Sequence, residues 1–394
     1  MKTLKALLPV TILAAAHGGV DFYGAFLQAL APVVSEHLAI QPGRIVALVG
    51  VVGLVTNGIQ PLIGLIMGKR NIAWILWGAL LLSMLPCFMG FIDSYWLLVI
   101  LVLGGSLGTG SFHPEGILSA HDSSGEYAHF GVPLFMAGGY FFTAAGAPIA
   151  IHWVSWFGLR SLVWFILPGL LLAALLYLNL RRKKAKHPSI VLRPRSQRRT
   201  RAIPGGVSIW PLLTVAVFCN IATALFLAII TSHYELTYGP ESRTWAGWVM
   251  LTIGGVGCLA SFFWGHICHK KGYFLVLLLT QLASAPLFIL LARADSPIAG
   301  FWYALPLSVI SPGSVYPVAV TLTRNASGLT QSLRAGLIVG GTWGLAALVV
   351  MAAGVLLDMG VPSWQLVSVS GFSCLVTAVV AGVQLLRGRA ARAT

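Results

Sequence analysis

The sequence predicts an all-α membrane protein with twelve transmembrane helices in two six-helix halves. Three observations lead to this fold class. The 394 residues are 57% hydrophobic and only 9% charged, the chain contains twelve long apolar runs, and short motifs recur about 200 residues apart. Because an ordinary soluble domain carries roughly 25% charged residues, a chain this poor in charge must present much of its surface to lipid.

Each spanning helix needs about 20 apolar residues, which the twelve runs supply. In the first half we expect spans at 6–31, 45–67, 72–92, 96–120, 129–152 and 160–180, and in the second at 209–232, 244–267, 273–293, 297–323, 334–357 and 364–386. The first run follows Lys2 and Lys5 and continues to about Pro32, so it is too long for the apolar core of a signal peptide. We therefore expect an uncleaved first span.

The one long polar stretch lies between the two sets of spans, from Arg181 to Ser208. It carries ten Lys and Arg residues together with Pro188 and Pro194, which make it a poor helix. We interpret it as a linker. The predicted organisation is an N-terminal six-helix bundle over 1–180, a basic cytoplasmic linker over 181–208 and a C-terminal six-helix bundle over 209–394.

The basic residues are distributed unequally between the two membrane faces. With the N-terminus inside, 21 of the 25 Lys and Arg residues fall on the inner face and four on the outer face. Since short cytoplasmic loops are enriched in Lys and Arg, we expect a multi-pass protein of the cell inner membrane with both termini cytoplasmic. The net charge of +15 lies in these short loops, so it does not indicate nucleic-acid binding.

Three motifs repeat between the halves at a nearly constant separation. The run from Gly64 to Arg70 matches Gly265 to Lys271, the run from Gly110 to Pro114 matches Gly313 to Pro317, and Gly138-Gly139 matches Gly340-Gly341. Repeats at one offset on equivalent spans indicate duplication. Parallel repeats of this kind are typical of secondary transporters, whose substrate site lies between the halves near the membrane midplane.

Only two acidic residues fall within the predicted spans, Asp21 in the first and Glu115 in the fourth. A charge at the bilayer centre costs about 2.5–3.5 kcal/mol on insertion scales, so such residues are expected to face a cavity or a partner. His17 precedes Asp21 by four residues, which places both side chains on one helix face. We predict that Asp21 and His17 share a proton and couple it to transport; the alternative is a buried pair that only stabilises the bundle.

The fourth span contains His113-Pro114-Glu115. Pro114 removes a backbone donor and is expected to bend the helix. Residues two apart point to nearly opposite helix faces, so we favour His113 for the substrate cavity and leave open whether Glu115 lines it or is structural. The other polar side chains that we expect along the passage are Gln28, Tyr140, Asn220 and Tyr316.

Several of these motifs occur together in one known group of proteins. The run from Gly108 to Glu115, the pair Gly138-Gly139, His17 with Asp21, and Gln60-Pro61 with Gly64 resemble the fosmidomycin-resistance group of major facilitator transporters. The resemblance implies the major facilitator fold, export as the direction of transport, and a role in antibiotic efflux.

The loop after the second span resembles the general signature of major facilitator transporters. On this resemblance the gating residues are Gly64, Lys69 and Arg70 in the first copy and Gly265, Lys270 and Lys271 in the second, with Pro114 and Pro317 as helix-bending positions. Gly68 and His269 stand where the signature has an acidic residue. The cytoplasmic latch that this acid supports in the family is therefore expected to be weaker or differently built.

We thus predict a proton-coupled secondary transporter that exports a small drug-like or polar metabolite by alternating access. The alternative is a proton-driven uptake symporter for an organic anion or nutrient. No convergent catalytic set argues for an enzyme, and no cofactor is expected. His266, Cys268 and His269 cluster at one span end without distant partners, so no metal site is predicted. The expected partners are a small-molecule substrate, protons and the lipid bilayer, and the expected state is a monomer.

Overall fold

The computed structural model confirms the all-α membrane fold. It describes residues 2–67, 74–124, 128–186, 208–323, 326–327, 329 and 331–393. Within these ranges the only β-type pairing is an isolated bridge between Ser208 and Ser327. Eleven helical segments of the described chain are long and apolar enough to cross a membrane, and a shorter apolar segment, Ile75–Phe91, supplies a twelfth.

The first six spans are built from ten helical segments. These are α1 (Lys2–Gly24), α2 (Phe26–Ala29), α3 (Ala31–His37), α4 (Pro42–Met67), α5 (Ile75–Ser83), η1 (Leu85–Phe91), α6 (Tyr95–Ser124), α7 (Ala128–Phe157), η3 (Leu159–Phe165) and α8 (Ile166–Lys186).

The last six spans follow after the linker. They comprise α9 (Ile209–Tyr238), η5 (Pro240–Ser242), α10 (Arg243–Leu251), η6 (Thr252–Val256), α11 (Gly257–Lys271), α12 (Tyr273–Ala292), α13 (Pro297–Ile310), α14 (Pro312–Leu322), α15 (Gln331–Gly336), η8 (Leu337–Gly341), α16 (Thr342–Asp358) and α17 (Ser363–Ala393).

Proline interrupts two of the predicted spans. In the third span α5 ends at Ser83 and the chain continues as the 3-10 helix η1, which has Pro86 in its first turn. In the tenth span Ser311 adopts an extended conformation, with ψ of 155°, between α13 and α14. Proline lacks an N–H group and disfavours helical backbone at the residue before it. Pro312 therefore explains the break at Ser311.

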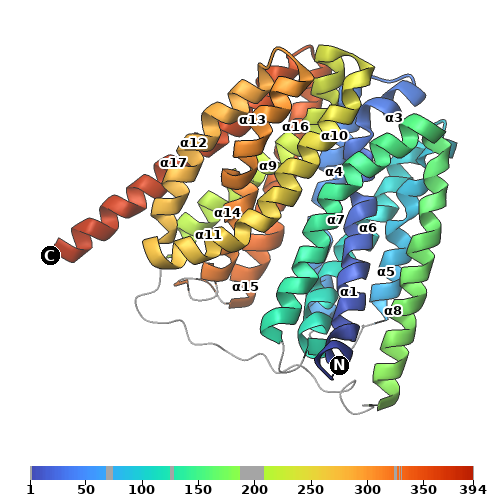
Figure 1. The fold of residues 1–394 in the computed structure, drawn as a ribbon, viewed down its shortest axis with the longest axis horizontal. Coiled ribbons are helices and arrows are strands. Elements are labelled where there is room, and N and C mark those ends of the chain that lie inside the picture. The colour runs from blue at the N-terminus through green and yellow to red at the C-terminus, as the bar shows by residue number, and fades with distance from the viewer. Residues whose placement is uncertain are drawn as a thin grey trace. The chain divides into compact units, whose positions relative to one another are not determined.

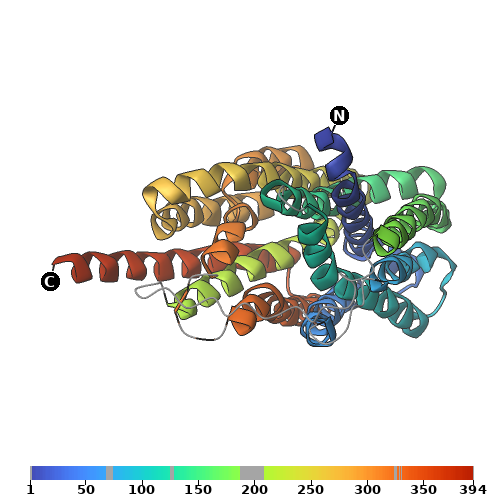
Figure 2. The same ribbon diagram turned by 90° about the horizontal axis from the view of Figure 1, so that it is seen from below.

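The helices group into two compact units. Unit 1 comprises Met1–Ala39 and Val55–Arg198, and unit 2 comprises Ile40–Leu54 and Arg199–Thr394. Helix α4 therefore contributes to both units, a feature that the proposed division at residues 181–208 does not include. Within unit 1, α1 packs against α6, α7 and α8 (Figure 1). Within unit 2, α9 and α12 pack against α17, whose C-terminal end projects beyond its neighbours (Figures 1 and 2).

Helix α1 is anchored in unit 1 by aromatic packing. The hydroxyl of Tyr23 donates a hydrogen bond to Phe165 O at 2.7 Å. The rings of Phe22 and Phe26 meet the ring of Phe165 edge-on, with centroids 5.3 and 5.6 Å apart. These contacts lie in the last turn of α1 and at the start of α2, directly after Asp21 in the sequence.

Candidate functional site

The predicted pair on α1 is present as a close contact. His17 Nε2 lies 3.3 Å from Asp21 Oδ2. The His17 side chain is buried, whereas 17% of the Asp21 side chain is exposed. The four-residue spacing therefore brings the two groups together one helical turn apart, as the helix period requires.

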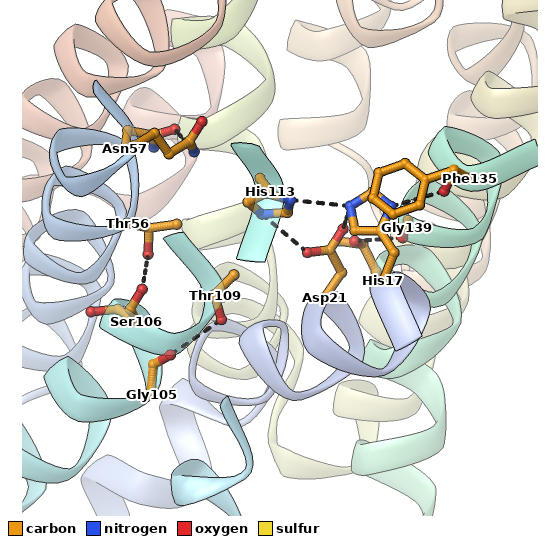
Figure 3. Close-up of polar contacts among 12 residues, drawn as sticks. His17, Asp21, Thr56, Asn57, Gly105, Ser106, Thr109, His113, Phe135 and Gly139 are labelled. Atoms are coloured by element: carbon orange, nitrogen blue, oxygen red, sulfur yellow. Dashed lines mark hydrogen bonds and ion pairs between the residues drawn. The ribbon is translucent and has the colours of Figure 1, made fainter. Parts of the chain in front are cut away.

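Helix α6 adds a third titratable side chain to this pair. His113 Nε2 lies 3.5 Å from Asp21 Oδ1, and His113 Nδ1 lies 3.1 Å from His17 Nε2. The two imidazole rings meet nearly perpendicular, at 82°. Figure 3 shows His113 reaching from α6 toward both residues of α1. We call His17, Asp21 and His113 the proton cluster, after the role that the sequence predicts for His17 and Asp21.

The buried histidine of the proton cluster is held in place by α7. His17 Nδ1 lies 2.8 Å from Phe135 O. The His17 ring stacks on the Phe135 ring, with centroids 4.2 Å apart and planes inclined by 9°, and Phe112 lies parallel to it at 6.0 Å. Since a carbonyl oxygen only accepts hydrogen bonds, His17 Nδ1 must carry a proton, and Nε2 is the nitrogen that faces Asp21 and His113.

Glycines let α1 and α7 approach closely enough for these contacts. A Cβ atom at Gly138 would lie 2.5 Å from Ala14 O. At Gly139 it would lie 2.6 Å from Asp21 Oδ2 and 2.7 Å from His17 Nε2. Small residues at helix interfaces are the usual means of such close approach in membranes. The Gly138-Gly139 pair noted in the sequence therefore lies directly against the proton cluster (Figure 3).

Matching donors to acceptors identifies one protonation state in which every contact of the cluster is paired. With His17 Nδ1 donating to Phe135 O, three contacts remain, and all are satisfied when His17 Nε2 and His113 Nε2 both carry protons and His113 Nδ1 accepts. This state contains one imidazolium, one neutral imidazole and one carboxylate. With one proton fewer, His17 Nε2 and Asp21 Oδ2 face each other as two acceptors, whichever nitrogen of His113 is protonated.

The same three residues are also the only described group of side chains whose donor atoms could hold a metal ion, since one atom from each lies within 4.8 Å of the others. Every one of these atoms has a partner inside the cluster. We therefore interpret the arrangement as a hydrogen-bonded network, and the sequence expectation of no metal site stays a prediction.

The described hydrogen bond of Glu115 lies outside the proton cluster. Its side chain is buried, and its Oε1 accepts a hydrogen bond of 2.9 Å from Ser119 Oγ, one turn further along α6. Helix α6 continues through Pro114 as one element. The structure thus brings His113 to Asp21 and leaves Glu115 in a separate buried contact.

Two more of the predicted cavity residues belong to unit 1. Gln28 is partly buried, and Tyr140 is 41% exposed. On α4, Thr56 Oγ1 donates to Ser106 O at 3.5 Å, and Gln60 Nε2 donates to Asn57 Oδ1 at 3.4 Å. Figure 3 places Thr56 and Asn57 on the side of His113 away from α1.

Unit 2 contains an uncharged counterpart of the proton cluster. Asn220 Nδ2 donates to Thr342 Oγ1 at 2.8 Å, and Tyr316 OH donates to Ile338 O at 2.6 Å. Asn220, Tyr316 and Ile338 follow His17, His113 and Phe135, respectively, by the same 203 residues. The residue that follows Asp21 by 203 is Ala224. The corresponding positions therefore carry titratable groups in unit 1 and neutral, hydrogen-bonded groups in unit 2.

The predicted gating residues are only partly described. Gly64 lies in α4, whereas Lys69 and Arg70 lie outside the described residues. In the second copy, a Cβ at Gly265 would meet open space, and Lys270 and Lys271 are exposed in the last turn of α11. Pro317 lies inside α14. His266 and His269 are exposed, whereas Cys268 is buried, and no described contact joins the three.

Comparison with known proteins agrees with this architecture. The sequence profile of the Major Facilitator Superfamily matches residues 13–327. The chain belongs to the major facilitator superfamily. It is a membrane transporter rather than an enzyme.

Two solved transporters share the fold of this facilitator at low sequence identity. A bacterial homolog of the human lysosomal transporter Spinster, in an inward-facing and occupied conformation, has a TM-score of 0.65 and 14% identity over 96% of this chain and 95% of its own. The nucleoside transporter NupG has a TM-score of 0.70 and 14% identity over 96% and 99%. Among curated proteins none matches this facilitator in sequence.

Sequence reasoning did not assign three features of the site. These are the Phe135 carbonyl, the Phe112 ring and the polar neighbours on α4. The carbonyl has no sequence signal, because any residue supplies one. The repeated Gly138-Gly139 pair marked Gly139 in the sequence, but nothing in the sequence indicated that Gly139 contacts the proton cluster.

Proposed function

We propose that this facilitator is a proton-coupled secondary transporter that exports a small drug-like or polar metabolite by alternating access. The observation that supports it best is the contact of Asp21 with both His17 and His113. Intramembrane ionisable groups that pair with one another are typical of proton pathways. Histidine is suited to this chemistry because its protonation changes near physiological pH.

The proton count of the cluster suggests how coupling works. In the fully paired state α1 and α6 are joined by donor–acceptor contacts from His17 and His113 to Asp21 and to each other. Loss of one proton leaves two acceptors 3.3 Å apart, which repel unless a donor or a cation enters. A substrate that carries a hydrogen-bond donor or a positive charge would stabilise the deprotonated cluster and so compete with the proton. Competition of this kind is what exchange of substrate for proton requires.

Unit 1 carries the proton chemistry in this proposal. The counterpart in unit 2, with Asn220, Tyr316 and Thr342, contains no group that titrates near neutral pH. One titratable copy and one neutral copy fit a transporter that couples to protons through its first half.

Export is inferred from the resemblance to the fosmidomycin-resistance group, because proton chemistry alone does not set direction. The second candidate is a proton-driven uptake symporter for an organic anion or nutrient. The partial exposure of His113, 22% of its side chain, supports it, because an imidazolium there could meet an anion. The proposed setting for either function is a monomer in the cell inner membrane with both termini cytoplasmic.

The test begins with a substrate screen, in which a ligand of the folded state raises the unfolding temperature in detergent. The compound found is then added to proteoliposomes that contain a pH-sensitive dye. We expect substrate-driven proton movement in the natural protein and none in Asp21→Asn. Glu115→Gln is the matched control, because it neutralises the other intramembrane acid, whose described hydrogen bond comes from Ser119.

The outcomes separate the candidates. Proton release from the compartment that gains substrate indicates antiport, and proton entry together with substrate indicates symport. If Asp21→Asn moves protons as well as the natural protein, the proton cluster has no coupling role.

A further inference from the structure

The tenth span is broken, whereas the matching span of the first half is continuous. Between α13 and α14, Ser311 is extended and is followed by Pro312, which has no N–H group. Helix α6, which carries the matching motif in unit 1, is one helix from end to end. The break is therefore a property of unit 2 rather than of the repeated framework. Broken helices inside a membrane are tolerated where other groups satisfy their backbone.

Side chains of α11 and α12 reach the carbonyl groups at this break. The last carbonyls of a helix have no donors within the helix. From α12, Gln281 Nε2 and Ser284 Oγ donate to Ile310 O at 3.5 and 2.9 Å. From α11, Trp264 Nε1 donates to Val309 O at 2.5 Å. All four helices belong to unit 2, so the arrangement is contained in one compact unit.

One buried oxygen beside the break has no partner. Gln281 is fully buried, and its Oε1 receives no hydrogen bond. The hydroxyl groups around the break already donate to backbone carbonyls, so their protons are in use; they belong to Ser284, Ser311 and Ser314. A buried acceptor without a donor is unfavourable. The missing partner must therefore bring a donor or a positive charge.

A glycine leaves further oxygen atoms of the break uncovered. Gly257 directly follows the π-helical turn η6, which packs on α13. A Cβ atom at Gly257 would lie 3.2 Å from Ser308 O and 3.6 Å from Ser311 Oγ, and glycine has no such atom to cover them. Helical turns of the π type inside α-helices are frequent at functional sites. Two irregular segments thus meet at a place lined by oxygen atoms.

We propose that the break in the tenth span is a binding site for a monovalent metal cation, such as Na⁺. The candidate ligands are Gln281 Oε1, Ser311 Oγ and the carbonyl oxygens of Ser308 and Ile310. Hard cations take oxygen ligands of these kinds. Unwound backbone carbonyls and the C-terminal ends of half-helices are suited to bind cations, because their partial charge is negative.

The chemistry of the ligands favours a single positive charge over water or a divalent ion. A buried water makes about three hydrogen bonds, and the donors described around the break are already engaged with carbonyl oxygens. The described contacts of the break involve no carboxylate to balance a second charge. The site also differs in kind from the proton cluster, because all of its ligands are neutral oxygens.

The cation site goes beyond the proposed function and does not depend on it. It lies in unit 2, whereas the proton cluster lies in unit 1. A bound cation would join Gln281 of α12 to the residues of the break and so stabilise the bend at Ser311. It would be detected as binding to the protein whether or not protons move with substrate.

The test measures binding of ²²Na⁺ to the purified full chain by scintillation proximity, with choline chloride holding the ionic strength constant. We expect saturable binding of a single ion per chain, displaced by unlabelled NaCl. Gln281→Leu should raise the dissociation constant by about 10- to 150-fold, the effect of losing a hydrogen-bonding group that meets a charge. Gly257→Ala removes no ligand but sets a methyl group against Ser308 O and Ser311 Oγ, so it should also weaken binding.

Two controls locate the ion. Gln365→Leu removes an exposed glutamine of unit 2 and should bind ²²Na⁺ as the natural protein does. Asp21→Asn should also retain binding, because it alters only the proton cluster. Gel filtration and the unfolding temperature in choline chloride show whether each variant is folded.

Several results would overturn the cation site. These are no saturable ²²Na⁺ binding in the natural protein, unchanged binding in Gln281→Leu, or loss of binding in Asp21→Asn. If Gln281→Leu does not fold, unchanged binding in Gly257→Ala overturns the site instead. A failed proton assay together with retained ²²Na⁺ binding removes only the coupling proposal.

Discussion

Substitution of Gly139 by alanine tests whether close approach of α1 and α7 holds the proton cluster together. The new methyl carbon would start 2.6 Å from Asp21 Oδ2 and 2.7 Å from His17 Nε2, and ordinary contact begins near 3.4 Å. Because His17 Cε1 lies closer still, either α7 moves back by more than 0.8 Å, the difference between 2.6 and 3.4 Å, or the two side chains rotate away from it.

Both responses weaken contacts that the structure shows. Overpacking of a well-packed interior costs about 1–3 kcal/mol, and loss of the bond from His17 to Phe135 O adds about 0.5–1.5 kcal/mol. We therefore expect Gly139→Ala to destabilise the protein by about 1.5–4.5 kcal/mol. We also expect it to reduce substrate-driven proton movement, because His17 no longer faces both Asp21 and His113.

The assay pairs thermal unfolding in detergent with proton movement in proteoliposomes. Gly78→Ala is the matched control, since a Cβ there meets nothing within 4 Å. It should be neutral or stabilising by up to about 1 kcal/mol, the helix preference of alanine over glycine. If Gly139→Ala unfolds at the natural temperature and couples protons normally, the close packing described here does not position the proton cluster.

Three further substitutions probe the surroundings of the two clusters. Tyr316→Phe removes the hydroxyl that donates to Ile338 O; it should lower stability by about 1 kcal/mol yet leave the proton stoichiometry unchanged, which dye measurements in proteoliposomes can check. Ser119→Ala removes a donor to buried Glu115 and should cost about 1–3 kcal/mol in denaturant unfolding. Phe135→Leu retains the carbonyl but loses a fully buried ring, so a lower unfolding temperature with proton coupling preserved is expected, and loss of coupling would show that the ring itself is required.

Hydrophobicity and helical periodicity were enough to predict much of this protein. The twelve spans follow from apolar runs. In lipid the backbone N–H and C=O groups of such a run need hydrogen-bond partners within the protein, and a helix supplies them within the run itself. The pairing of His17 with Asp21 follows from a four-residue spacing. Each of these is a property of one helix, which local sequence determines.

Relations between helices needed the tertiary structure. No spacing could show that His113 on α6 meets Asp21 on α1, that a carbonyl of α7 orients His17, or that Asn220 and Tyr316 form the neutral counterpart in unit 2. Nor could sequence show that residues 42–54 of α4 group with unit 2. The physical reason is that contacts between helices depend on how glycines and large side chains fit across their surfaces, which the sequence of either helix alone does not contain.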